Sequence, residues 1–346
     1  MKSYLRLTSI GDMSELRRFL ARAFGVRPDA PSLDPAVMSW KYWDRRDDWS
    51  GPRSYVLERD GAIVAHAGIW PMTFSAGAEA VYGIQMIDWA SARESPGAGL
   101  ALVQKLASMF DFIYSIGGSE MTCKALPAFG FSEYTREWRG MRPLRPLRQI
   151  LAHQTRTWKL APRLFRNWLW SMSKGLSPYK NWKAIEIVPD EILGEIYLAG
   201  AADARFSPRP PAFFEYLLRC PVARFSLYGI VDNGELRGHF VISVLRGQAR
   251  LAGVWLREPT RETWAAAYFL THRTALHLKG VYEIVTIGSE GPSREGAYEA
   301  GFRIVQGSSV YLLDKRRKLN LSPEFQFQLC DDDAAFLDSG TASYWT

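Results

Sequence analysis

Six consecutive residues, Glu94-Ser95-Pro96-Gly97-Ala98-Gly99, carry the clearest chemical pattern in the chain. They follow an apolar run from Tyr82 to Ala90 and precede apolar residues at helical spacing from Leu100 to Phe110. A strand that passes through a glycine-rich turn into a helix directs several backbone N–H groups at one point, where the helix dipole also favours negative charge. The pattern therefore predicts a site for a phosphate-bearing ligand. A plain tight turn is the alternative interpretation, because glycine pairs are common at helix starts.

The elements around this turn form a recognisable unit. Ser54 to Arg59 and Ala62 to Trp70 flank Asp60-Gly61, a dipeptide typical of the two-residue turn of a hairpin. The run from Tyr82 to Ala90 and the short run from Phe112 to Ile116 flank the predicted helix. We therefore expect a parallel βαβ unit attached to antiparallel hairpins, an α/β fold with a mixed sheet.

The same order of elements recurs in the second half of the chain. Ile116-Gly117-Gly118-Ser119-Glu120 returns as Ile287-Gly288-Ser289-Glu290, and the close Gly130-Phe131 returns as Gly301-Phe302. Each copy is long enough to be a whole domain rather than one turn of a solenoid. We predict two tandem domains, 1–140 and 185–318, joined by a linker, 141–184, and followed by a tail, 319–346.

Composition limits the class of protein. The 346 residues match two domains of ordinary size, and 47% hydrophobic with 23% charged residues is typical of globular chains. The sequence shows no signal peptide and no span long enough for a membrane, so we expect a cytoplasmic protein. The three cysteines lack the paired spacing of a zinc site, and we expect no metal.

The segment between the two copies is strongly basic. From Arg136 to Lys183 the sequence has twelve Lys and Arg residues against Glu137 alone, interleaved with tryptophans. This mixture suits an anionic interface. Three interpretations stay open: a solvated pair of linker helices, a peripheral contact with an anionic membrane at its inner face, or a grip on a polyanionic acceptor such as an acidic glycan or tRNA.

The order of elements resembles the GCN5-related acetyltransferase superfamily, whose motif Q/R-x-x-G-x-G/A falls on Glu94 to Gly99. The resemblance covers most of 1–140 and 185–318. It implies that Glu94, Ser95, Gly97, Ala98 and Gly99 hold the pyrophosphate of acetyl-CoA or another acyl-CoA. Glu94 departs from the pattern, since the family has Gln or Arg at this position.

Neither copy has the whole set of family motifs. The second copy replaces the glycine turn with Glu258-Pro259-Thr260, and proline has no N–H to donate. It retains Tyr298 in Tyr298-Glu299-Ala300-Gly301-Phe302, which matches a family motif whose tyrosine often protonates the departing thiolate. The first copy has Pro127 at that place. Tyr114 and Tyr82 are alternative donors there, although aromatic residues in strands are usually packing residues. We predict that the cofactor binds the first copy and that the second shapes the acceptor site.

In this family a carboxylate or a chain of waters usually takes the proton of the acceptor amine. Asp88, on the strand that leads into the glycine turn, is the candidate base; the alternative is that it completes a hydrogen-bond network. Glu120 is a second candidate base, or an acid that stabilises a helix N-terminus. His66 and His239 occupy matching strand positions and are expected to be core residues rather than catalysts.

The resemblance implies an acyl-CoA-dependent N-acyltransferase. We expect its acceptor to be a small-molecule or glycan amine, for which a cell-envelope or polysaccharide precursor is one candidate. Two alternatives stay open: a Fem-like transferase that uses aminoacyl-tRNA, and a non-catalytic binding module with a decayed cofactor site. We rank tRNA below the small-molecule and glycan acceptors as a partner and expect no contact with DNA.

Overall fold

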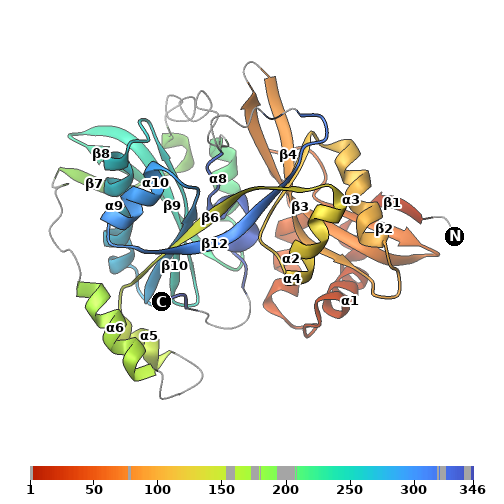
Figure 1. Cartoon of the computed structure of the whole chain (residues 1–346), viewed down its shortest axis with the longest axis horizontal. Coiled ribbons are helices and arrows are strands. Elements are labelled where there is room, and N and C mark those ends of the chain that lie inside the picture. Colours follow the sequence, from red (N-terminus) through yellow and green to blue (C-terminus); the bar gives the residue numbers. More distant parts are fainter. Residues whose placement is uncertain are drawn as a thin grey trace.

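The computed structural model describes residues 3–76, 79–152, 160–172, 179, 181–192, 207, 209–317, 319, 325–338 and 344–346. No helix within these ranges is both long and apolar enough to cross a bilayer. Two lobes lie side by side, and a pair of helices projects from one of them (Figure 1).

The first half of the chain alternates strands and helices in the order expected from the sequence. Its elements are β1 (Ser3–Leu7), α1 (Met13–Phe24), α2 (Pro35–Tyr42), β2 (Ser54–Arg59), β3 (Ala62–Ala76), β4 (Glu79–Ser91), α3 (Ala98–Met109), β5 (Phe112–Ile116), α4 (Glu120–Ala125) and β6 (Ser132–Pro143). A 3₁₀ turn, η3 (Leu126–Phe129), follows α4.

The second half repeats this order after two connecting helices. Its elements are α5 (Pro146–Leu151), α6 (Leu160–Met172), β7 (Trp182–Glu186), α8 (Pro211–Leu218), β8 (Arg224–Asp232), β9 (Glu235–Leu245), β10 (Gln248–Leu256), α9 (Arg261–His277), β11 (Glu283–Gly288), α10 (Pro292–Glu299) and β12 (Arg303–Leu313). The predicted fold class, a mixed α/β fold, is confirmed.

All twelve of these strands belong to one sheet, in the order β1-β2-β3-β4-β5-β12-β6-β11-β10-β9-β8-β7. The two halves exchange their last strands. β12 pairs with β5 of the first half, β6 pairs with β11 of the second, and β6 and β12 pair with each other in the centre. Continuous backbone hydrogen bonding therefore runs through both halves.

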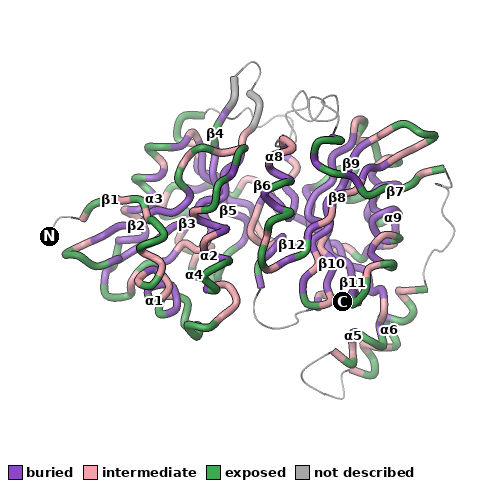
Figure 2. The backbone as a smooth tube through the Cα atoms, turned by 180° about the vertical axis from the view of Figure 1, so that it is seen from behind, coloured by how far each residue is buried: buried purple, intermediate pink, exposed green. Residues whose placement is uncertain are grey.

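Helices cover both faces of the first-half sheet. Leu57 of β2 packs in one apolar cluster with α3, and the adjacent Val56 packs in another with α1 and α2. Successive strand residues point to opposite faces, so α3 lies on one face and α1 and α2 lie on the other. Buried residues are concentrated along the strands of both halves (Figure 2).

The last segment of the chain is part of the core, although the sequence predicted only a tail. Leu329, Cys330 and Phe336 are buried in the largest apolar cluster, together with Trp40 and Trp70 of the first half. The indole of Trp70 donates to the carbonyl of Cys330 at 2.8 Å. Residues 325–338 therefore fill the space between the two halves.

The cysteines are free thiols: Cys330 is buried, and Cys123 and Cys220 are half-buried. No group of His, Cys, Asp and Glu side chains suited to a metal ion occurs among the described residues.

Candidate active site

A β-bulge at Asp88 and Trp89 interrupts β4 shortly before the glycine motif, which begins at Glu94. Ile87 pairs with Gly68 and Ala90 pairs with His66, so Asp88 and Trp89 together oppose the single residue Ala67 of β3. Asp88 has φ 49°, a left-handed conformation that is uncommon for residues other than glycine. Bulges change the direction of a side chain and bend the strand, and they recur next to active sites.

β4 and β5 separate at the same level. They pair in parallel only from Gly83 to Gln85, opposite Phe112 to Tyr114. Beyond Gln85, β4 keeps only its partner β3, and β5 keeps only β12. The backbone of β4 around the bulge is therefore not hydrogen-bonded to β5.

The glycine turn leaves the start of α3 uncapped. Gly97, the N-cap residue, has φ 83°, and no side chain caps the helix or places an acid in its first turn. The N–H of Ala98 donates to the Ser95 carbonyl at 3.1 Å, whereas the N–H groups of Gly99 and Leu100 have no acceptor within the helix. A Cβ at Gly97 would meet no atom within 4 Å, so the space beside the Cα atom of this residue is open.

The other residues of the motif differ in exposure. Ser95, Ala98 and Gly99 are buried at the base of the turn, whereas Glu94 and Gly97 are exposed. Glu94 therefore lies on the surface of the loop and does not enter the first turn of α3. The structure brings all five predicted cofactor-binding residues together with Asp88 at one end of β4.

Trp89 provides a further donor that the sequence did not single out. Its indole N–H is buried without an acceptor among the described residues. The ring lies 3.5 Å from the position of a Cβ on Gly99 and makes an edge contact with Phe129 of η3, with centroids 5.7 Å apart. A buried N–H without a partner is rare, and here it adjoins the uncapped helix start.

The matching turn in the second half is closed by its own side chains. Thr260 caps α9 by accepting from the N–H of Thr263 at 3.3 Å, and the Thr263 hydroxyl accepts in return from the N–H of Thr260 at 3.0 Å. Glu262 places an acid in the first turn. This helix start is therefore poorly suited to bind a phosphate.

The Asp88 carboxylate is held by two consecutive residues of α2. Lys41 forms an ion pair with it, and the Tyr42 hydroxyl donates to it at 2.5 Å. Burial acts to raise the pKa of Asp88, but the Lys41 charge and these hydrogen bonds hold it below its ordinary value. Asp88 is therefore a weaker base than a free carboxylate, and its catalytic role stays a prediction.

His66 supports the bulge from β3. One ring nitrogen lies 2.9 Å from the Asp88 carbonyl oxygen and the other 3.0 Å from the Ser54 hydroxyl. Burial lowers its pKa to about 4, so the ring is neutral at pH 7. The interpretation of His66 as a satisfied core residue is confirmed. His239 is also buried, but neither ring nitrogen has a partner in the described part of the chain.

Glu120 and Tyr298 lie farther from the bulge. Glu120 is the first residue of α4, after the C-terminal end of β5; its side chain is 84% exposed and forms an ion pair with Lys124. Tyr298 is on α10, which packs on α9 in the other lobe from α3 (Figure 1). The structure therefore does not bring Tyr298 into one site with Gly97. The Tyr114 hydroxyl donates to the Asp331 carbonyl and is buried.

Three consecutive acids of the last segment, Asp331, Asp332 and Asp333, lie next to β4. They were not predicted as site residues from the sequence. Asp331 is ion-paired with Arg209 at 2.6 Å, and Asp332 accepts from the side-chain amide of Gln85 at 3.2 Å. Burial and the charge of Asp88 raise the pKa of Asp333 to about 6. Burial and Asp333 raise the pKa of Asp332 well above its usual range. A run of three acids ordinarily indicates a solvated loop. The apolar residues on both sides of the run, such as Leu329 and Phe336, were the feature of the sequence that could have predicted its burial.

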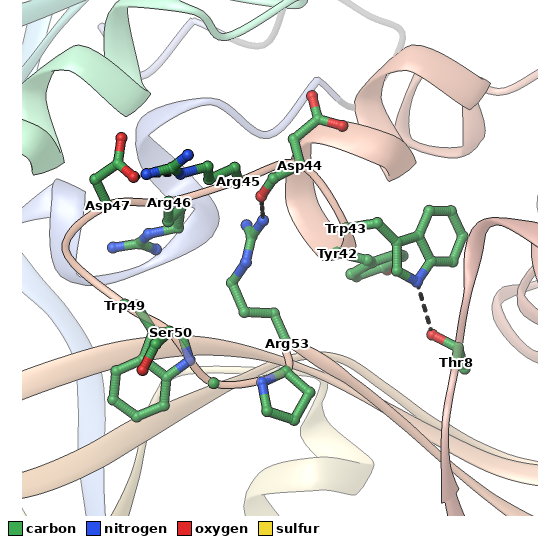
Figure 3. Close-up of a pocket in the computed structure, with 12 residues that line it drawn as sticks. Thr8, Tyr42, Trp43, Asp44, Arg45, Arg46, Asp47, Trp49, Ser50 and Arg53 are labelled. Atoms are coloured by element: carbon green, nitrogen blue, oxygen red, sulfur yellow. Dashed lines mark hydrogen bonds and ion pairs between the residues drawn. The ribbon is translucent and has the colours of Figure 1, made fainter.

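A polar cavity of about 680 Å³ lies beside α2 (Figure 3). The loop between α2 and β2 forms most of its wall, including Asp44, Arg45, Asp47 and Arg53. Tyr42 also lines it, and its hydroxyl contacts Asp88. The cavity therefore adjoins the residues that hold the β4 bulge.

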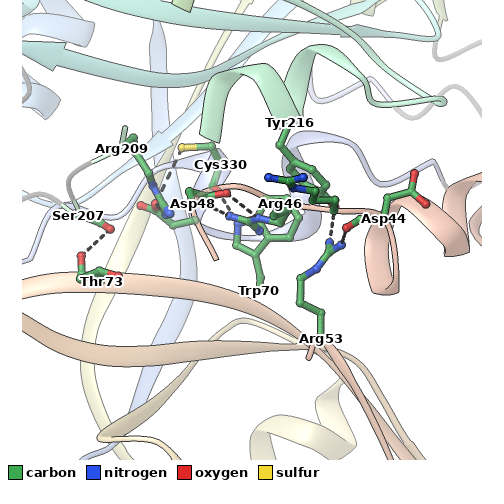
Figure 4. A network of polar contacts seen from close by, with 12 residues as sticks. Asp44, Arg46, Asp48, Arg53, Trp70, Thr73, Ser207, Arg209, Tyr216 and Cys330 are labelled. Carbon is green, nitrogen blue, oxygen red and sulfur yellow. Dashed lines mark hydrogen bonds and ion pairs between the residues drawn. The ribbon is translucent and has the colours of Figure 1, made fainter. Parts of the chain in front are cut away.

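The wall of this cavity is fixed by contacts between the halves (Figure 4). The Arg46 guanidinium is bonded to both oxygens of Asp48 and lies over the rings of Trp70 and Tyr216. Arg53 donates to the Tyr216 hydroxyl at 2.6 Å. Tyr216 belongs to α8, so the second half positions a loop of the first.

Comparisons with known proteins identify the fold. No family model and no curated protein matches the sequence. The solved structures that it resembles include GCN5-related N-acetyltransferases from Anabaena variabilis (TM-score 0.57, 12% identity, 90% of this chain and 73% of that chain) and Sphaerobacter thermophilus (0.52, 16%, 92% and 98%). A third is the N-myristoyltransferase of Saccharomyces cerevisiae with bound myristoyl-CoA (0.58, 10%, 90% and 80%). The chain has the fold of the GCN5-related N-acetyltransferases.

Proposed function

We propose that the protein is an acyl-CoA-dependent N-acyltransferase and a tandem two-domain member of the GCN5-related superfamily. The observation that carries this proposal is the difference between two equivalent helix starts. In the first half an uncapped α3 follows a bulged strand that has separated from its neighbour, whereas in the second half Thr260 and Thr263 cap α9. One cofactor site per chain follows from this difference.

The residues at the first turn fit a pyrophosphate. The backbone N–H groups of Gly99 and Leu100 have no acceptor within α3, and the indole N–H of Trp89 has none among the described residues, so these three donors would hold it. An acyl-CoA supplies an acyl group activated as a thioester. The exposed Glu94 is the one unfavourable charge on the loop, and it lies outside the first turn of α3. The yeast N-myristoyltransferase of similar fold binds an acyl-CoA.

The acceptor amine must lose a proton to attack the thioester. Asp88 and Glu120 are the candidates from the sequence, and Asp333 is a third. We favour Asp333, because its pKa of about 6 is closer to neutrality than that of Asp88, which Lys41 and Tyr42 hold low. In this proposal Asp88 positions the bulge, and Tyr298 has no role in the first-half site.

The acceptor is proposed to be a small-molecule or glycan amine, such as a precursor of a cell-envelope polysaccharide. The polar cavity beside Tyr42 contains carboxylates and guanidinium groups, which suits an acceptor rich in hydroxyl and amino groups. A Fem-like transferase that uses aminoacyl-tRNA and a non-catalytic binding module are the alternatives.

The test is the release of CoA thiol from acetyl-CoA and longer acyl-CoAs in the presence of lysine, polyamines and amino sugars. We expect amine-dependent release by the native protein and none by Gly97→Val. Gly61→Val is the matched control, because Gly61 also has positive φ (78°) in open space but lies in the β2–β3 turn. No acyl-CoA binding together with a salt-sensitive tRNA complex would favour the tRNA-dependent class. Glycan binding without acyl-CoA binding would favour the binding module.

A further inference from the structure

The two helices that connect the halves expose apolar side chains on their outer surface. Figure 1 shows α5 and α6 projecting from the second lobe, and Figure 2 shows how little of them is buried. Six large apolar side chains are between 47% and 68% exposed: Leu147, Leu151, Phe165, Trp168, Leu169 and Met172. We call these six residues the apolar patch. Such a cluster is unusual on a free soluble surface.

The inner side of α6 is polar instead. Asn167 is its fully buried residue, and its side-chain amide donates to Gln149 of α5 at 2.9 Å. Gln149 in turn donates to Glu283 at 3.0 Å, at the start of β11. A helix that packs on a protein core normally directs its apolar side inward. The reversed arrangement of α6 indicates that its outer side packs against something else.

A hollow between α5 and α6 continues the patch. It has a volume of about 600 Å³, and its walls include Leu147, Phe165 and Trp168. Arg145 and Arg148 line its edge. The hollow can therefore receive an apolar group, with the exposed Arg148 beside it.

The basic residues near the patch fall into two classes. The Arg142 guanidinium is buried and donates to the Ala300 carbonyl, and Arg145 donates to the carbonyls of Leu276, Leu278 and Val281. Because backbone carbonyls occupy both guanidinium groups, Arg142 and Arg145 do not act as free surface charges. Their place in a run of basic residues had suggested that they would be exposed. Arg148 is exposed beside Leu147 and Leu151.

The sequence around the patch has one sign of charge. Neither α5 nor α6 contains an acidic residue, and Glu137 is the single acid between Arg136 and Lys183. The stretches that flank α6 in the sequence add Arg156, Lys159 and Lys174, whose placement lies outside the described residues. A second copy of this chain would present the same positive charge to the patch and would be repelled.

We propose that the apolar patch docks on the surface of an anionic lipid bilayer, with the six side chains inserted at the level of the headgroups. Tryptophan, phenylalanine, leucine and methionine flanked by basic residues are typical of helices that lie in this interface. The buried chain of hydrogen bonds from Asn167 to Gln149 and from Gln149 to Glu283 ties both helices to the second half. The docked protein would therefore hold a fixed orientation relative to the membrane.

The experiment is co-sedimentation of the whole protein with phosphatidylglycerol vesicles and with neutral phosphatidylcholine vesicles, at low and high salt. We expect binding to the anionic vesicles at low salt, weaker binding at high salt, and little binding to the neutral vesicles. Arg148→Ser should reduce the binding constant by about five-fold, the equivalent of about 1 kcal/mol per basic residue near the surface.

The double variant Phe165→Asp and Trp168→Asp should lose vesicle binding by at least about ten-fold. Its control, Ile10→Asp with Val188→Asp, changes two other exposed apolar residues and adds the same charge. Failure to bind anionic vesicles at low salt, or equal binding by the two double variants, would overturn the proposal. Concentration-dependent dimers that only Phe165→Asp and Trp168→Asp abolish, without vesicle binding, would assign the patch to a second copy.

Discussion

Lys41, a buried residue of α2, is ion-paired with Asp88, the left-handed bulge residue of β4. The contact joins a helix on one face of the sheet to the strand that leads into the glycine turn. It explains how a strained backbone conformation is retained at the bulge, since positive φ at a residue other than glycine persists only where the surroundings hold it. It also fixes the negative charge of Asp88 close to Asp333, one of the three consecutive acids of the last segment.

The buried pair should be sensitive to loss of one partner. Lys41→Met leaves the Asp88 carboxylate buried without its counter-ion, and we expect the free energy of unfolding to fall by about 3–5 kcal/mol. Urea denaturation at pH 7 measures this change. The double variant Lys41→Met with Asp88→Asn should regain most of the loss. Arg45→Met breaks an exposed pair with Asp47 and should change stability little. Equal effects of the two single variants would contradict a structural role for the Lys41 pair.

The identity of the base can be read from the pH dependence of kcat/KM. If Asp333 takes the proton, the rate rises with pH around 6, where this carboxyl ionises, and Asp333→Asn lowers kcat by about two to four orders of magnitude. If Asp88 takes it, no inflection occurs near pH 6, because the pKa of Asp88 is below its ordinary value. Asp88→Asn would then lower kcat by the same factor with acyl-CoA affinity nearly intact. Near-native turnover of both variants would transfer the role to Glu120 or water.

Asp333→Asn should not destabilise the protein. The pKa of the Asp333 carboxyl is higher in the folded protein than in the unfolded chain, so its protonated form stabilises the fold. This stabilisation is fully present below the unfolded pKa and is lost as pH rises through about 6. At pH 7 the charged form is therefore unfavourable, and the neutral amide should raise the free energy of unfolding. A lower stability of Asp333→Asn at pH 7 than at pH 4, relative to the native protein, would contradict the raised pKa.

Buried histidines should make the fold sensitive to acid. Burial lowers the pKa of His66 to about 4 and that of His239 and His272 to about 3, so the unfolded chain takes up protons first, from about pH 6.5 downward. The free energy of unfolding should therefore fall between pH 6.5 and 3. His239→Phe should make this fall shallower, because its ring nitrogens have no partner in the described structure. His277→Phe, at an exposed position of α9, is the control for the substitution itself.

The local elements were largely predictable from the sequence. The strands Ser54 to Arg59 and Phe112 to Ile116 have the predicted bounds, because the local pattern of apolar residues determines them. The exchange of β6 and β12 was not predicted, since the pairing of distant strands has no local signature in either strand. The packing of Asp332 and Asp333 below β4 was missed for the same reason. Likewise, nothing in the periodicity of α2 distinguishes Lys41 from a solvated helix residue.

The glycine turn shows what the sequence can and cannot provide. The types and order of Gly97 and Gly99 predicted a helix start that directs several backbone N–H groups at one point, and in the structure no side chain caps this helix start. The proline at position 259 predicted a poor phosphate site in the second half, and the reciprocal capping by Thr260 and Thr263 agrees with it. The open donor of Trp89 depends on the contact with Phe129, which only the fold reveals.

The central claim is that the chain has one acyl-CoA site, at the start of α3. Calorimetric titration with acetyl-CoA and with a longer acyl-CoA tests it most directly, for the native protein, Gly97→Val and the control Gly61→Val. We predict one molecule bound per chain by the native protein and by Gly61→Val, and no measurable binding by Gly97→Val. Two molecules per chain, or an affinity of Gly97→Val equal to that of the control, would contradict the account.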